Sequence, residues 1–176
     1  MRRLERTGLA ATVAALAVGG VIAACSNTVT GTAQVNQEEL VLYTSEVRAS
    51  SAAASSSRAA VIERAARSAC RAFRDTNKRS IDAFNAYIDA GNSRAPDIPA
   101  KAAAATTALR AASSRIGSEL TASVPSAVTV ALRAYISDST TLANMVERNA
   151  PSAEMNTHID KFNATKNRAV HACDDY

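Results

Sequence analysis

The sequence predicts an all-α fold: an antiparallel up-and-down four-helix bundle with one disulfide linking the first and last helices. From about residue 57, apolar residues recur every three or four positions in four successive segments, which is typical of amphipathic helices. Glycine, asparagine and proline separate these segments, so the connections between helices are short. The sequence has no alternating strand pattern and no Asn-Gly or Asp-Gly turn, which disfavours β-structure.

The first 24 residues have the pattern of a secretory signal peptide. Arg2, Arg3 and Arg6 give a positively charged start, and residues 9–24 are free of charge. This apolar run of about 16 residues is short for a helix that crosses a bilayer. We therefore expect residues 1–24 to be a signal peptide that is removed on export.

The Ile-Ala-Ala-Cys sequence that ends at Cys25 resembles a bacterial lipobox, in which the cysteine is acylated and becomes the new N-terminus. The resemblance implies that Cys25 carries acyl chains such as palmitate and anchors the protein at the extracytoplasmic face of the cell membrane. The alternative is an ordinary secretory signal with a chance cysteine. Residues 25–36 would then form the lipidated cysteine and a small, polar, flexible tether.

Length and charge limit the function of the remaining chain. Without residues 1–24, 152 residues remain, and we assign residues 37–176 to a single helical bundle domain. The formal charge falls from +4 to +2, because residues 1–24 hold three arginines and one glutamate. A charge this close to zero gives no case for binding nucleic acid. The aromatic content of 4% and the absence of tryptophan disfavour a stacking surface for sugars or bases.

Residues 37–56 are the part of the domain whose structure the sequence leaves open. Residues 37–43 are apolar enough to dock on the bundle. Residues 50–57 are all serine or alanine, and these two residue types have opposite effects on helix formation. We favour a helix next to the bundle, with a linker as the alternative.

Four apolar stripes define the predicted bundle helices, and Gly91-Asn92, Pro125 and Pro151 separate them. The first stripe holds Ile62, Ala66, Cys70 (or Ala69), Phe73, Asn77, Ile81, Phe84 and Ile88. The second holds Ala102, Ala105, Leu109, Ala112, Ile116 and Leu120. The third holds Val128, Leu132, Tyr135, Ser139, Leu142 and Val146. The fourth holds Met155, Ile159, Phe162, Ala169, Val170 and Cys173.

The cysteines suggest a structural disulfide. With Cys25 assigned to the lipobox, Cys70 and Cys173 remain, and an exported domain with one pair of cysteines is expected to oxidise it. Both lie on the apolar stripes of their helices, which supports the pairing independently. A redox pair is the alternative, although no Cys-x-x-Cys motif is present.

The chain resembles the mycobacterial and other actinobacterial lipoproteins of uncharacterised function. The resemblance is carried by the lipobox at Cys25, the threonine-rich tether, the Ala/Ser-rich run at 49–60 and a helical body with two late cysteines. It implies an exported, lipid-anchored helical protein. It supplies no catalytic residues to transfer to this sequence.

Few residues are arranged for catalysis or metal binding. His158 and His171 lie near a common face of the fourth helix, and with Glu154, Asp174 or Asp175 they could form a weak metal site. We favour the alternative of two surface histidines. No Gly-x-Ser-x-Gly motif and no glycine-rich phosphate loop occurs. We expect no catalytic residues, no metal and no cofactor.

Two sets of polar residues stand out on the predicted helices. Arg64, Arg67, Arg71 and Arg74 recur every three or four positions, which makes a basic ridge for an acidic protein, lipid or glycan of the envelope, or a solvated helix face. Asn77, Ser139 and Lys166 lie on otherwise apolar stripes. Such residues either fix the register of the helices, which we favour, or line a small cavity.

The function that we expect is a non-catalytic interaction or scaffold module at the outer face of the membrane. The alternative is a carrier or sensor that holds a small apolar or amphiphilic ligand between helices, with Tyr87 or Tyr135 as a polar contact. A carrier needs a cavity of a few hundred Å3, whereas an interaction module needs an exposed patch over a solid core. An enzyme needs a cleft that holds a titratable group with a perturbed pKa.

Overall fold

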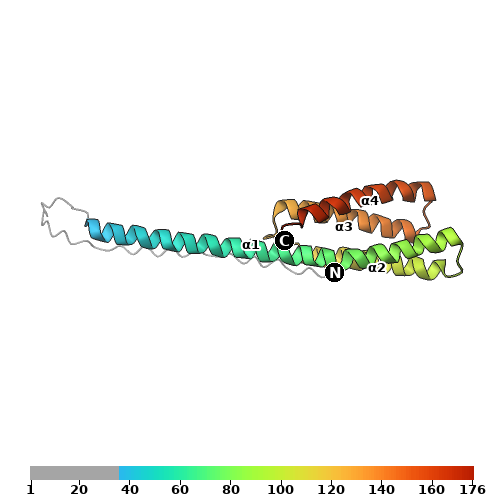
Figure 1. The fold of residues 1–176 in the computed structure, drawn as a ribbon, viewed down its shortest axis with the longest axis horizontal. Coiled ribbons are helices and arrows are strands. Elements are labelled where there is room, and N and C mark those ends of the chain that lie inside the picture. The colour runs from blue at the N-terminus through green and yellow to red at the C-terminus, as the bar shows by residue number, and fades with distance from the viewer. Residues whose placement is uncertain (1–35) are drawn as a thin grey trace, which may run out of the picture.

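Residues 36–176 are described by a computed structural model, and they form four α-helices and no strand (Figure 1). α1 spans Gln37–Ser93, α2 spans Ile98–Glu119, α3 spans Ser126–Glu147 and α4 spans Ser152–Ala172. The predicted all-α, four-helix fold is confirmed. The predictions for residues 1–24 and for Cys25 lie outside the described residues.

The four helices pack in chain order and reverse direction at each connection (Figure 1). α1 packs against α2, α2 against α3, and α3 against α4. α1 has 57 residues, whereas α2, α3 and α4 have 22, 22 and 21. The N-terminal half of α1 therefore extends well beyond the end of the bundle, as Figure 1 shows. Within residues 36–176, no helix combines the length and the hydropathy that a membrane crossing requires.

Aromatic side chains join three of the helices at the centre of the core. The Tyr135 ring on α3 is fully buried, and its centroid lies 5.0 Å from that of Phe73 on α1 and 5.4 Å from that of Phe162 on α4. The Phe73 and Tyr135 rings meet edge to face, an arrangement that aromatic pairs favour. The Tyr135 hydroxyl donates to Asn77 Oδ1 over 3.1 Å. Asn77 therefore contacts the core tyrosine, and it does not line the cavity described below.

The predicted apolar stripes agree with the buried positions of the structure, apart from two residues. Every predicted stripe residue of α3 is buried, and those of α2 are buried or half-buried. Ile62 and Val170 were expected inside but are 44% and 42% exposed. Ile62 lies beyond the C-terminal end of α2, since Glu119 at that end accepts a hydrogen bond from Ser68. On α4, the buried face runs through Thr165 and Ala169, so Val170 points outward.

The disulfide that the sequence predicts is present between α1 and the C-terminal end of α4. The Cα atoms of Cys70 and Cys173 are 5.5 Å apart, and both residues are buried. Cys173 is the residue that follows α4 and caps it. The Arg74 guanidinium reinforces this junction, because it donates to the backbone carbonyls of Cys173 and Tyr176, each over 3.2 Å. The end of the bundle nearest the exposed half of α1 is thus held covalently.

At the other end of the bundle, α1 ends in a left-handed C-cap. α1 was expected to stop at Gly91-Asn92, but it continues to Ser93 and ends at Arg94, whose φ of 52° is left-handed. The Arg94 N–H bonds the Gly91 carbonyl over 3.2 Å, and the Ala95 N–H bonds that of Ala90 over 2.9 Å. This pattern satisfies carbonyls at the helix end. The prediction missed the boundary by two residues, because a left-handed arginine leaves no mark in the sequence.

Candidate functional site

The exposed N-terminal half of α1 is the main candidate, and we call residues 37–64 the arm. Every residue of the arm is exposed except Ala60, which is half-buried, and the first fully buried residue of α1 is Ala66. An α-helix of this length is about 40 Å long. Residues 37–43, whose apolar character left docking on the bundle open, are helical and exposed along their whole length. The open question about residues 37–56 is answered in favour of helix.

The arm is helical because its ends and side chains favour it locally. The Asn36 side chain accepts from the Glu38 N–H over 3.1 Å, and two glutamates in the first turn complement the positive end of the helix dipole. The hydroxyls of five residues donate to carbonyls three positions earlier: Thr44, Ser45, Ser50, Ser51 and Ser56. These five hydroxyl groups are therefore satisfied within the helix.

Large apolar side chains are concentrated on the arm. Seven of the nine exposed large apolar residues in the described part of the chain lie on it: Leu40, Val41, Leu42, Tyr43, Val47, Val61 and Ile62. Their exposed fractions range from 40% to 66%. The other two, Val130 and Val170, lie on α3 and α4. A soluble helix rarely presents so many apolar side chains unless another surface covers them.

The predicted basic ridge begins where the arm meets the bundle, but its four arginines differ in surroundings. Arg64 and Arg71 are exposed, and within residues 36–176 neither of them forms a hydrogen bond or an ion pair. Arg67 forms an exposed ion pair with Glu63 at 2.6 Å. Arg74 contacts the carbonyls of the chain end, as described above. Arg64 and Arg71 therefore have the guanidinium groups most accessible to a partner.

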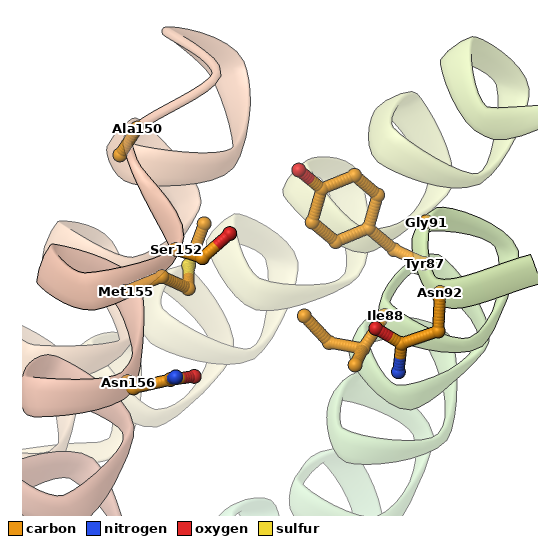
Figure 2. A pocket seen from close by; sticks show the side chains of 8 residues that line it. All are labelled: Tyr87, Ile88, Gly91, Asn92, Ala150, Ser152, Met155 and Asn156. Atoms are coloured by element: carbon orange, nitrogen blue, oxygen red, sulfur yellow. The ribbon is translucent and has the colours of Figure 1, made fainter. Parts of the chain in front are cut away.

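A cavity of about 280 Å3 lies between the C-terminal part of α1 and the start of α4, at the end of the bundle away from the disulfide (Figure 2). Its lining combines apolar Ile88 and Met155 with polar Tyr87, Asn92 and Asn156. Figure 2 shows the Tyr87 ring and Ile88 on one wall and Met155 and Asn156 on the other. No charged side chain lines it. Its chemistry therefore suits a small neutral molecule with one or two hydrogen-bonding groups.

The two tyrosines that were named as possible ligand contacts have different surroundings. Tyr87 lines the cavity, whereas Tyr135 is fully buried in the core. Burial raises the pKa of the Tyr135 phenol above its ordinary value of 10.0. Elsewhere, the hydrogen bond between Arg110 and Glu147 lowers the pKa of that exposed carboxyl. Neither shifted group lies in the cavity.

Comparison with known proteins identifies the fold family. The model of the family described as the Rv2240c four-helix bundle domain matches residues 52–174. The chain belongs to this family. No curated protein and no solved structure matches the chain. The match covers α2, α3, α4 and the bundle half of α1, and it begins inside the arm.

Within this Rv2240c-type bundle, the two histidines are too differently placed to act together. His158 was expected on the surface but is only 8% exposed, and its Nε2 lies 2.9 Å from the Asp138 carbonyl of α3. His171 is exposed, with Nδ1 3.3 Å from Asp174 Oδ2. Among residues 36–176 no three potential metal ligands of the His, Cys, Asp or Glu type come together. His158 thus connects α4 to α3.

The family domain contains one buried carboxylate, Asp138, that sequence patterning does not single out. Asp138 on α3 is 3% exposed, and its Oδ1 lies 3.1 Å from Lys161 Nζ on α4, while its Oδ2 has no partner. Together with His158, this pair joins the two helices that form the C-terminal half of the bundle. The one feature of the sequence that could have indicated this burial is that Asp138 directly precedes Ser139, a buried residue of the third predicted stripe.

Proposed function

We propose that this chain is a cell-envelope lipoprotein, anchored through Cys25 at the extracytoplasmic face of the membrane, and that it acts as a non-catalytic interaction module. The signal-like residues 1–24 and the lipobox-like ending at Cys25 support the anchor. The family domain supplies a stable body, and the arm supplies the binding surface. The observation that carries this proposal is the group of seven exposed apolar side chains on the arm.

The contrast between arm and bundle favours an interaction module over the other two classes. The bundle has a closed core of its own, in which Phe73, Tyr135 and Phe162 contact one another. The cavity at Tyr87 is open at the surface and small for a carrier. Tyr135 and Glu147, whose pKa values are shifted, both lie outside this cavity.

Cell fractionation tests the anchor. Cys25→Ala should release the protein from membranes into the soluble fraction, because no acyl chain can be attached. Ser26→Ala, one residue further on, is the matched control and should remain with the membranes. Membrane association of the Cys25→Ala protein that resists high salt and carbonate would contradict a lipid anchor at this position.

Site-specific photo-crosslinking in intact cells tests the interaction surface. A photoreactive phenylalanine analogue at Leu42 on the arm should give discrete adducts with envelope components. The same analogue at Val130, which is 68% exposed on the bundle, is the matched control and should give few. Equal labelling from both positions, or none from Leu42, would contradict a role for the arm in binding.

The carrier remains the second candidate, on the strength of the α1–α4 cavity. Native mass spectrometry of the protein from an actinobacterial host would then show an extra mass that is lost on denaturation. Ile88→Trp, which fills the cavity, should abolish that mass. A bare protein at the oxidised mass would count against the carrier.

A further inference from the structure

We propose that the arm binds the arm of a second copy of this chain, with the two helices antiparallel. This inference deepens the proposed function and rests on it, because it names the partner of the same surface. Three observations carry it: the spacing of the arm's apolar residues, the small residues at its centre, and the opposite charge of its two ends.

The spacing of the apolar residues is that of a helix-pairing seam. Leu40, Val47, Ala54 and Val61 recur every seven residues. Tyr43 lies three positions after Leu40, in the second seam position of the same repeat. A seven-residue repeat keeps one stripe of a helix facing a partner helix along its length. This stripe continues to Val61, so Leu40, Tyr43 and Val47 at one end of the arm share a face with Val61 at the other.

The centre of the arm allows a close approach. Residues 50–57 are all serine or alanine, and all are exposed. Small side chains on every face let a second helix come near without a specific fit. The hydroxyl groups of Ser50, Ser51 and Ser56 already donate to carbonyls of the same helix. A second helix that packs closely here therefore leaves few polar groups without a hydrogen-bond partner.

The charges decide the direction of pairing. Residues 37–50 hold three glutamates and one arginine, whereas residues 58–64, the other end of the arm, hold two arginines and one glutamate. A parallel pair would bring like charges together at both ends. An antiparallel pair brings the acidic end of each arm to the basic end of the other, which includes Arg58 and, from the predicted basic ridge, Arg64.

A single register satisfies all three features. With the two-fold axis at the level of Ala52, Tyr43 lies beside Val61 of the second copy, and Val47 lies beside Ser57. In this register Glu39 is level with Arg64 and Ala65 of the second copy. Arg64 lies three positions after Val61 and Glu39 lies one position before Leu40, so both side chains border the seam at this level. Their charges therefore meet across the pair.

Cysteine crosslinking in intact cells tests this register on the full chain. Co-expressed Tyr43→Cys and Val61→Cys variants should form a disulfide-linked dimer on oxidation, because these positions face each other. Each variant alone should crosslink at least fivefold less. The matched control is Ser45→Cys with Ala59→Cys, which are level with each other in this register but on the outer faces, and should not crosslink.

Charge exchange provides a second test that leaves the bundle untouched. Glu39→Arg or Arg64→Glu should each raise the dissociation constant of the detergent-solubilised dimer at least tenfold in sedimentation experiments. The double variant Glu39→Arg/Arg64→Glu should restore it to within threefold of the original.

Two results would overturn the inference. Efficient self-crosslinking of Tyr43→Cys alone would mean a parallel pair, and no crosslinking in the mixed pair would mean that no such dimer forms. If the mixed pair fails while Leu42 still gives adducts of other masses, the arm binds a different partner, and the proposed function stands without this inference. If both fail, the arm is not a binding surface.

Discussion

α1 is one continuous helix with two halves that behave differently. In the bundle half, a buried or half-buried side chain occurs at least every three or four residues, and Cys70, Phe73 and Phe84 all lie inside the core. In the arm, comparable apolar residues such as Leu42 and Tyr43 are 64% and 66% exposed. The difference is whether another element lies beside the helix, since α2 ends level with Ser68. Substitutions in the two halves should therefore have very different effects on the free energy of unfolding.

The largest effect is expected from the disulfide at the junction of the two halves. Cys70→Ser opens a loop that spans 103 residues, which should lower the free energy of unfolding by about 4–5 kcal/mol in the chain-entropy view. Thermal unfolding measures the loss, and Cys173 should become reactive to thiol reagents. An unchanged melting temperature would remove the disulfide from the account of stability.

Truncation of an aromatic side chain in each half gives a direct contrast. Phe73→Ala should cost about 3–5 kcal/mol, because Phe73 is 2% exposed and contacts Tyr135. The matched variant Tyr43→Ala on the arm should change the free energy of unfolding by no more than about 0.5 kcal/mol in dilute solution. Chemical unfolding of both variants provides the test. Similar losses would mean that the arm is part of the folded core.

A smaller, pH-dependent effect is expected at Tyr135. Tyr135→Phe should cost about 1–2 kcal/mol at neutral pH, because Asn77 loses its hydrogen-bond donor. Burial raises the pKa of the folded-state phenol, so above about pH 10 the unfolded chain releases this proton and the folded chain keeps it. The original protein should therefore lose stability as the pH rises above about 10. The Tyr135→Phe protein should lose less, and unfolding curves at pH 8 and 10.5 measure the difference.

Much of the bundle could be predicted from the sequence, because helical periodicity records which face of a helix is buried. The stripe of α3 was correct at every position from Val128 to Val146. Cys70 and Cys173 could be paired by counting. The position of His158 could not be predicted, because its partner is a backbone carbonyl on another helix, and sequence spacing does not record such contacts.

The arm was harder to predict for the same reason that makes it a candidate site. Periodicity shows that residues 40–47 have an apolar character but not whether the surface that covers them belongs to the same chain. The sequence suggested docking on the bundle, and the structure leaves these residues uncovered. Ile62 was placed in the core by spacing alone, although no neighbouring helix reaches that far. Where α2 ends relative to α1 is set by the packing of the two helices, and the spacing of apolar residues along α1 does not record it.

The central claim is that the bundle is self-sufficient and the arm is a surface for a partner. Hydrogen–deuterium exchange of the full chain at two protein concentrations tests it most directly. In dilute solution the amides of residues 45–60 should exchange at least 100-fold faster than those of α3, and concentration should slow exchange in the arm alone. Equal protection of arm and bundle at every concentration would contradict the account, because the arm would then be part of the folded domain.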